Sequence, residues 1–119
     1  MNRSCIFCRI VAGEIPAQIV YQDEDCLAFR DINPQAPVHL LVIPREHIAS
    51  LDDARSEHAA LLGRLLLAGA EVARREGLGD DLDRRGFRTV VNTGAGAGQS
   101  VFHLHVHILG GRPFGWGPG

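Results

Sequence analysis

Residues 99–109 read Gln99-Ser100-Val101-Phe102-His103-Leu104-His105-Val106-His107-Ile108-Leu109, and apolar residues alternate with histidines from position 102 to 108. Successive side chains of a β-strand point to opposite faces. A strand over residues 102–108 would bury one apolar row and present His103, His105 and His107 together. Three adjacent imidazoles suit a metal ion or an anionic reaction centre better than a core. We predict that this strand carries the functional site.

The segment before the histidines is rich in glycine. Residues 92–100 contain three glycines and two alanines. Glycine lets backbone N–H groups approach an anion closely and turn toward it. A hairpin connection without a function is the alternative. The position beside three histidines favours a loop that binds phosphate.

Composition limits the classes of function. The chain has 119 residues, enough for one domain, and a formal net charge of −2. No Lys/Arg cluster stands out, which argues against nucleic acid as a partner. Phosphate chemistry would then depend on backbone N–H groups, histidines and hydroxyls, and this favours a mononucleotide over a polymer.

Hydropathy and cysteine count indicate a cytoplasmic protein that has no membrane partner. No apolar run is long enough to span a bilayer, and the N-terminus lacks the apolar region of a secretory signal. The three cysteines are an odd number, which fits a disulfide framework poorly.

Hydrophobic periodicity predicts an α+β fold, in which a five-stranded antiparallel sheet is combined with one long and one short helix. We expect the short helix at residues 5–12 and strands at 17–21, 26–30, 38–43, 86–92 and 102–108. The long helix should begin at a capping box formed by Ser50 and Asp53 and end before Gly77. Residues 79–85 should be a charged loop. All of residues 1–119 form one domain, with 110–119 as a C-terminal tail.

Three features outside the histidine stretch are ambiguous on their own. Cys5 and Cys8 share one face of a helix. The pair could be half of a zinc site, a redox pair or two buried free thiols. Asp31 follows a strand, where aspartate usually forms a turn. His39 lies in a strongly apolar strand, where a histidine is more often a hydrogen-bonded core residue than a catalyst.

Residues 103–109 match the pattern His-φ-His-φ-His-φ-φ, in which φ is apolar. Together with Gly98-Gln99-Ser100, Ala28-Phe29-Arg30-Asp31-Ile32 and His39-Leu40-Leu41-Val42-Ile43-Pro44, the chain resembles the histidine-triad (HIT) superfamily. The similarity is closest to its Hint branch of purine nucleoside phosphoramidases and covers nearly the whole chain.

This resemblance implies a hydrolase that cleaves purine nucleoside 5′-phosphoramidates, derivatives of AMP or GMP, at the P–N bond. His105 would attack the α-phosphorus and form a covalent nucleotidyl-histidine, with no cofactor needed for the chemistry. His103, His107, His39 and Ser100 would complete the catalytic set.

The resemblance also implies a binding site, a metal site and an assembly. Asp31 would accept hydrogen bonds from both ribose hydroxyls, and Phe29 and Ile32 would bracket the base. The expected nucleotide-binding residues are Ile6, Phe7, Ile10, Phe29, Asp31, Ile32, Asn92, Gly98, Gln99, Ser100, Val101, His105, His107 and Trp116. Cys5, Cys8, His47 and His103 are the expected ligands of a structural zinc. The chain would form a homodimer through its fourth and fifth strands and its long helix, with the tail and Trp116 near the partner's site.

Three other functions compete with this one. A sibling enzyme would split dinucleoside polyphosphates, but the tail with Trp116 favours the Hint branch. A nucleotide-sensing module would bind with little turnover, against which His105 and Ser100 argue. In a simple zinc protein the three histidines would all be ligands, but alternate strand positions lie roughly 6.5 to 7 Å apart, too far for an undistorted tetrahedron.

Overall fold

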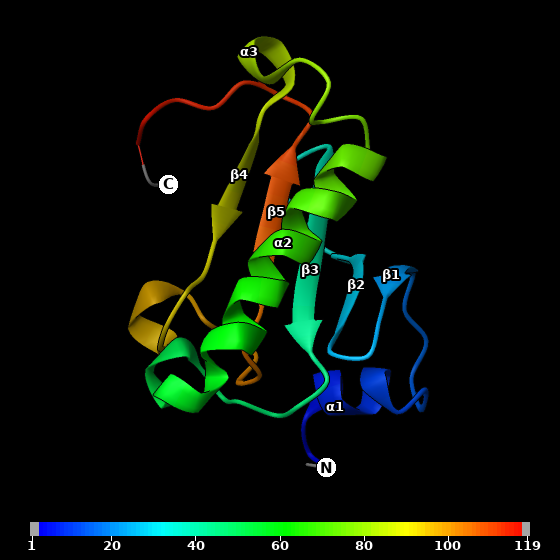
Figure 1. Ribbon diagram of the computed structural model, residues 1–119, viewed down its shortest axis with the longest axis vertical. Helices are drawn as coiled ribbons and strands as arrows, with labels where there is room; N and C mark the ends of the chain where they lie inside the picture. Colours follow the sequence, from blue (N-terminus) through cyan, green and yellow to red (C-terminus); the bar gives the residue numbers. More distant parts are fainter. Residues whose placement is uncertain (1–2, 118–119) are drawn as a thin grey trace.

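The computed structural model describes residues 3–117, and its sheet confirms the expected α+β class (Figure 1). Five antiparallel strands lie in the order β1-β2-β3-β5-β4. The strands are β1 (Ile19–Gln22), β2 (Cys26–Arg30), β3 (Val38–Pro44), β4 (Phe87–Val90) and β5 (Val106–Gly110). The helices are α1 (Ile6–Val11), α2 (Ala59–Arg75) and α3 (Leu82–Arg85), with 3₁₀ turns at Leu51–Asp53, Ser56–His58 and Ala95–Ala97.

Helix α2 covers one face of the sheet (Figure 1). Its buried residues Leu65, Ala68, Val72 and Ala73 pack against a row of small and branched strand residues. That row comprises Cys26, Ala28, Leu40, Val42, Val106 and Ile108. Burying this apolar area is the main source of stability for the long helix.

The opposite face is divided into a covered and an open part. Helix α1 contributes Phe7, Cys8 and Ile10 to a second apolar cluster, whose strand residues are Leu27, Phe29, Leu41 and Ile43. These strand residues come from β2 and the far end of β3. Farther along the same face lie the polar side chains of β3 and β5, His39 and His107. The fold therefore leaves a polar area of the sheet beside an apolar one.

The predicted histidine strand is only half formed. Strand β5 begins at Val106, and residues 101–105 are irregular. The pairing of Val42 with Val106 would place Pro44 opposite Leu104. Proline has no N–H to donate, so the ladder ends there. The Leu104 amide instead donates to the Ile48 carbonyl, at 2.6 Å. Phe102, expected in the apolar row, is 51% exposed.

The predicted start of the long helix is wrong. Helix α2 begins at Ala59, and 3₁₀ turns occupy residues 51–53 and 56–58. Ser50 donates its hydroxyl proton to the Asp53 carboxylate at 2.8 Å, so it does not cap a backbone amide. Ala54 and Arg55 are extended, which interrupts the helix. The loop expected at 79–85 contains the single helical turn α3, and the fourth strand is shorter than predicted.

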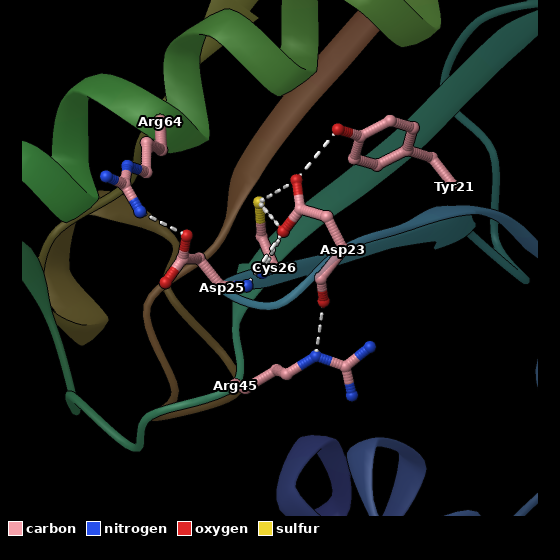
Figure 2. Close-up of polar contacts among 6 residues, drawn as sticks. All are labelled: Tyr21, Asp23, Asp25, Cys26, Arg45 and Arg64. Atoms are coloured by element: carbon pink, nitrogen blue, oxygen red, sulfur yellow. Dashed lines mark hydrogen bonds and ion pairs between the residues drawn. The ribbon is translucent and has the colours of Figure 1, made fainter.

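The turn between β1 and β2 is fixed by one carboxylate (Figure 2). Asp23 accepts hydrogen bonds from the amides of Asp25 and Cys26, at 2.8 and 2.9 Å, and from the Tyr21 hydroxyl at 2.7 Å. Burial acts to raise the pKa of Asp23, but these hydrogen bonds outweigh it and lower the pKa to about 2. Arg64 of α2 pairs with Asp25 and ties the hairpin to the long helix. The polar cluster therefore anchors the turn.

None of the helices within residues 3–117 has the length and apolar character needed to cross a membrane. Residues 1–2 and 118–119, which the single-domain prediction includes, lie outside the described part of the chain.

Candidate active site

A cavity of about 370 Å³ opens where α1, the end of β2 and the segment before β5 meet. Its volume lies within the range usual for small-molecule sites. Ten of the predicted nucleotide-binding residues line it: Ile6, Phe7, Ile10, Phe29, Asp31, Ile32, Ser100, Val101, His105 and His107. The apolar side chains come mainly from α1 and β2, and the histidines and Ser100 from the C-terminal half. The cavity thus combines an apolar wall with a polar end.

His105 is held in one tautomer by the backbone. Its Nδ1–H donates to the carbonyl oxygen of His103, at 2.8 Å. Because a neutral imidazole carries one proton, Nε2 then keeps its lone pair. Phe7 packs edge-on against the ring, with centroids 5.3 Å apart. The arrangement leaves an unprotonated nitrogen in a ring that lines the cavity, which is what a nucleophile requires.

His107 is held in the opposite tautomer by a chain of hydrogen bonds. The Gln35 amide donates to His39 Nδ1 at 3.0 Å, so the proton of neutral His39 is on Nε2. His39 Nε2 lies 2.9 Å from His107 Nδ1 and donates to it. The proton of His107 is therefore on Nε2. Among the described residues this buried atom has no hydrogen-bond partner.

A buried N–H without an acceptor is costly, and such groups mark places where a ligand supplies the missing atom. Desolvation lowers the pKa of His107 to about 4, and His105 and His39 add to the effect. Desolvation also lowers the pKa of His39, against an opposing effect of Asp31. Both rings are therefore neutral at neutral pH. His107 offers a neutral donor for an anionic oxygen.

Asp31 lines the cavity at the end of β2. One carboxylate oxygen accepts from the Asn33 amide at 2.8 Å, which is the turn-forming role expected of a strand-end aspartate. The other lies 3.4 Å from His39 Nε2. Ile32 beside it is fully exposed at the rim. Asp31 therefore retains acceptor capacity toward the cavity.

The glycine loop is shaped by a buried glutamine. Gln99 accepts from the Gly94 amide at 2.8 Å and donates to the carbonyls of Ala49 and Val101. Gly94 and Gly98 have positive φ angles of 87° and 94°, which explains glycine there. Gln99 and Gly98 do not line the cavity, whereas Ser100, next in the chain, does. The side chain of Gln99 thus sets the loop's shape.

Two other predicted nucleotide-binding residues lie elsewhere. Asn92 lines an adjoining cavity of about 380 Å³, which shares His107 with the first one. Trp116 is 97% exposed and contributes to neither cavity within its own chain. The tail containing it runs beside β4 (Figure 1), where Arg88 donates to the carbonyls of Gly115 and Gly117. Within one chain, Trp116 does not line the first cavity.

Four predicted ligands converge on a second centre beneath α1. The donor atoms of Cys5, Cys8, His47 and His103 all lie within 4.8 Å of one another. His47 Nδ1 and His103 Nδ1 are 3.2 Å apart, Cys5 Sγ is 3.3 Å from His103 Nδ1, and Cys8 Sγ is 3.3 Å from His47 Nδ1. With bonds of about 2.0 to 2.3 Å, a tetrahedral zinc separates its ligands by roughly 3.3 to 3.8 Å. This cluster can hold such an ion.

The surroundings of the cluster also fit a metal. His103 Nε2–H donates to the Pro44 carbonyl at 2.8 Å, which leaves Nδ1 free to coordinate. Cys5 caps α1 by accepting the Cys8 amide, so the chain turns both sulfurs to one side. Burial raises the pKa of Cys5, and a bound cation would reverse this by favouring the thiolate.

Several residues of the site were not predicted from the sequence. Gln35 acts through its backbone amide, which leaves no signal in the side-chain pattern. Ile15, Pro16, Ala17, Arg30 and Leu41 line the first cavity. Arg88, Arg112 and Phe114 line the second cavity, and their spacing shows no periodicity. The two arginines were not singled out because they form no cluster in the sequence.

Known proteins have sequences similar to this chain over most or all of its length. A model of the HIT domain matches residues 12–114. An uncharacterized HIT-like protein of Synechococcus elongatus is 56% identical over 119 residues, which cover 100% of both chains. Protein HitA of Neisseria gonorrhoeae is 54% identical over 107 residues, 90% of this chain and 95% of the relative.

Solved structures agree. The crystal structure of a HIT family hydrolase from Legionella pneumophila is 48% identical and has a TM-score of 0.90, covering 97% of this chain and 99% of the other. The chain belongs to the HIT domain family. The expected superfamily is thereby confirmed, while its Hint branch stays a prediction. Cys5 and Cys8 lie before the matched range, so the family match does not cover the whole metal cluster.

Proposed function

We propose that this protein is a nucleotide hydrolase that cleaves purine nucleoside 5′-phosphoramidates at the P–N bond. The observation that carries the proposal is the pair of opposite tautomers on two neighbouring histidines. His105 has a free lone pair, and His107 has a free N–H. A nucleophile beside an oxyanion donor is the minimum requirement for substitution at phosphorus. The Legionella relative, named a hydrolase, supports a hydrolytic outcome.

In the first step, His105 Nε2 attacks the α-phosphorus and a phosphorus–nitrogen bond to the imidazole forms. The bond from phosphorus to the substrate amine breaks, and the amine leaves with a proton taken from solvent or through the Ser100 hydroxyl. In the second step, water attacks the same phosphorus and the bond to His105 breaks. The products are a nucleoside monophosphate and the free amine, and the water proton passes to solvent.

The neighbouring groups assist both steps. The free N–H of His107 donates to a phosphoryl oxygen and favours the charge that develops there. His39 keeps that proton on the correct nitrogen, as the orienting partner does in other catalytic constellations. Asp31 accepts hydrogen bonds from the ribose hydroxyls, and the apolar wall with Phe29 and Ile32 holds the base. The Cys/His cluster supplies structure: a bound metal would fix His103, whose carbonyl orients His105.

We also propose a homodimer. The outward side of α2 carries an exposed apolar stripe formed by Ala59, Ala60, Gly63, Leu66 and Leu67. Leu66 and Leu67 are 54% and 71% exposed, and β4 is an edge strand. Exposed apolar patches and open sheet edges favour association. A Leu66→Glu/Leu67→Glu variant should sediment as a monomer, whereas Leu82→Glu, at a 65% exposed leucine of α3, should leave the assembly unchanged.

The function is tested with a panel of adenosine, guanosine, cytidine and uridine 5′-phosphoramidates, assayed with and without a chelator. We expect release of the monophosphate, faster for the purines, and turnover that survives brief chelation. Turnover of dinucleoside polyphosphates alone would favour the sibling activity. Tight binding of AMP without any turnover would favour a nucleotide sensor.

A further inference from the structure

Another cavity, which we call the side cavity, opens beside the proposed reaction centre at the start of α1. Its volume is about 280 Å³, slightly below the usual range of a site for a whole ligand. It shares Ile6, Ser100 and Val101 with the first cavity and extends past them to Phe102. The residues that line it are Ser4, Cys5, Ile6, His47, Ser100, Val101 and Phe102. The side cavity therefore has the size and position to hold one group of a substrate bound in the first cavity.

Ser100 relates the side cavity to one part of that substrate. In the proposed reaction, one route of the proton to the departing amine runs through the Ser100 hydroxyl, and the amine then lies beside it. Ser100 lines the first cavity and the side cavity, whereas the second cavity is lined by Asn92 and His107 without it. The second cavity also opens beside edge strand β4, within the face that we propose for the homodimer. A group attached to the amine therefore extends most directly into the side cavity.

The wall of the side cavity is apolar. Ile6, Val101 and Phe102 form its apolar part, and among residues 3–117 no Asp, Glu, Lys or Arg lines it. Cys5 and His47 also line it, and a bound metal would occupy their donor atoms. A charged group would lose hydration in this cavity without gaining a partner of opposite charge. An apolar group would bury its surface there without that cost.

Two large side chains of this wall are exposed. Ile6 and Phe102 are 49% and 51% exposed, although the alternation in the sequence predicts that Phe102 is buried. Because the ladder ends at Pro44, the chain around Phe102 lies outside the sheet and the ring does not enter the core. Exposed apolar patches mark places where another molecule binds. Since both side chains line a cavity that adjoins the reaction centre, the substrate is the nearest such molecule.

We propose that Ile6, Val101 and Phe102 form a specificity site for an uncharged, apolar group on the leaving amine. The inference rests on the proposed function, because it names the class of amine that the enzyme releases. Ile6 and Val101 also line the first cavity, whereas Phe102 lines the side cavity and not the first. Substitution of Phe102 should therefore change the leaving-group preference and keep the contacts to the nucleoside.

The first test compares three substrates of nearly equal size. They are the adenosine 5′-phosphoramidates of 3-methylbutylamine, 2-(dimethylamino)ethylamine and β-alanine, whose amines end in an apolar, a cationic and an anionic group. We expect wild-type kcat/KM to be about tenfold or more higher for the apolar substrate than for either charged one, the range that a methylene group contributes in an apolar pocket. Absence of a preference for the apolar amine would overturn the proposal.

Variants of Phe102 locate the effect. Phe102→Ala should lower the apolar-to-anionic ratio of kcat/KM about tenfold, and Phe102→Leu should restore part of it. A ratio taken within one variant cancels a general loss of activity, and comparison between variants cancels intrinsic differences between the amines. Leu51→Ala is the control and should keep the wild-type ratio, because Leu51 is 44% exposed and lines none of these three cavities. Equal ratios in wild type and Phe102→Ala would contradict the assignment to Phe102.

A second copy of the chain is the other occupant that an exposed phenylalanine can bind. The homodimer that we propose uses α2 and β4, so Phe102→Ala should sediment as the wild type does. Dissociation of the Phe102→Ala variant into monomers would assign Phe102 to a contact between copies and would overturn the specificity site.

A binding measurement separates this inference from the proposed function. The 4-methylpentylphosphonate and 3-carboxypropylphosphonate esters of adenosine at its 5′ oxygen have a P–C bond that cannot be hydrolysed. We expect calorimetry to show that wild type binds the apolar ester about tenfold more tightly than the carboxylate and that Phe102→Ala does not. A protein that discriminates here but hydrolyses no phosphoramidate would retain the apolar site and lose the proposed function. Equal binding of the two esters by wild type would overturn the apolar site, whatever the activity.

Discussion

His103 and His107 lie four residues apart and belong to two centres that differ in how their polar atoms are used. In the Cys/His cluster, the ring nitrogens of His103 face Pro44 and the other three ligands, so each has a partner. At the reaction centre, His107 Nε2 has none among the described residues. The first centre is complete for a small ion supplied from outside. In the second, the proposed anionic substrate would supply the acceptor that His107 Nε2 lacks.

The two centres meet at His105. Its Nδ1–H donates to the carbonyl of His103, so His103 contributes its ring to the candidate metal cluster and its backbone to the proposed nucleophile. Proteins commonly orient a reactive imidazole through the nitrogen that does not react. Some residues would therefore take part in the reaction, and others would orient the reacting side chains. Substitutions can test this distinction.

The largest effect should follow from removing the nucleophile. His105→Asn should lower phosphoramidate turnover at least about 10³-fold, because no covalent intermediate can form. Metal content and thermal stability should change little, since the cluster ligands remain. Single-turnover trapping with labelled nucleotide should mark wild type only. Label on the variant would show that another histidine is the nucleophile.

A smaller loss should follow at the unpartnered donor. His107→Ala should lower kcat about 10²- to 10³-fold, the cost of losing one oxyanion donor. KM should change far less, because the interaction strengthens in the transition state. Steady-state kinetics on one substrate would separate the two parameters. A rise in KM with kcat unchanged would show that His107 only binds substrate.

At the Cys/His cluster we expect substitutions to change metal content and stability first. Cys5→Ser/Cys8→Ser should lose about one zinc per chain and several degrees of thermal stability, because metal binding contributes to folding. Elemental analysis and a thermal scan would measure both. Cys26→Ala is the matched control, since Cys26 is a buried cysteine outside the cluster. Metal-free wild type of full stability would contradict a structural metal.

The smallest effect should appear in the pH dependence of stability. The folded pKa of His107 is about 4, and the ordinary value is about 6.5. Between these values the unfolded chain binds a proton that the folded chain does not, so stability is full above pH 6.5 and falls toward pH 4. The slope is at most about 1.4 kcal/mol per pH unit. Urea unfolding with chelator should show a shallower slope for His107→Gln, and identical slopes would exclude this contribution.

Much of the fold was predictable because its elements are encoded locally. The strand at Cys26–Arg30 was predicted with its observed bounds, and α1 and β3 to within one residue at each end. The start of α2 was not predictable, because the Ser50 hydroxyl bonds to a side chain instead of an amide. The true extent of β5 depends on Pro44, which opposes it only in the folded sheet. Local sequence patterns do not indicate such long-range partners.

The site was predictable to a similar degree. Ten expected nucleotide-binding residues line one cavity, and the four expected ligands converge, because each set lies on elements with a clear pattern. The tautomers of His105 and His107 were not predictable, since backbone atoms of His103 and Gln35 set them. Arg88 and Arg112 meet at the ring of Phe114, which joins β4 to the tail only in the folded chain.

The position of Pro44 affects which amino-acid substitutions the chain can accept. Beyond the last rung of the ladder, residues 99–105 depend on the side chains of Gln99, His103 and His105, with few backbone hydrogen bonds such as that of the Leu104 amide. Residues 106–110 hold theirs through backbone hydrogen bonds that any non-proline residue can supply. A systematic substitution scan should find conservative apolar replacements accepted in the second group and few replacements accepted in the first. For folding, the border of mutational tolerance then falls between two adjacent residues, His105 and Val106, while His107 stays constrained by its proposed role in the reaction.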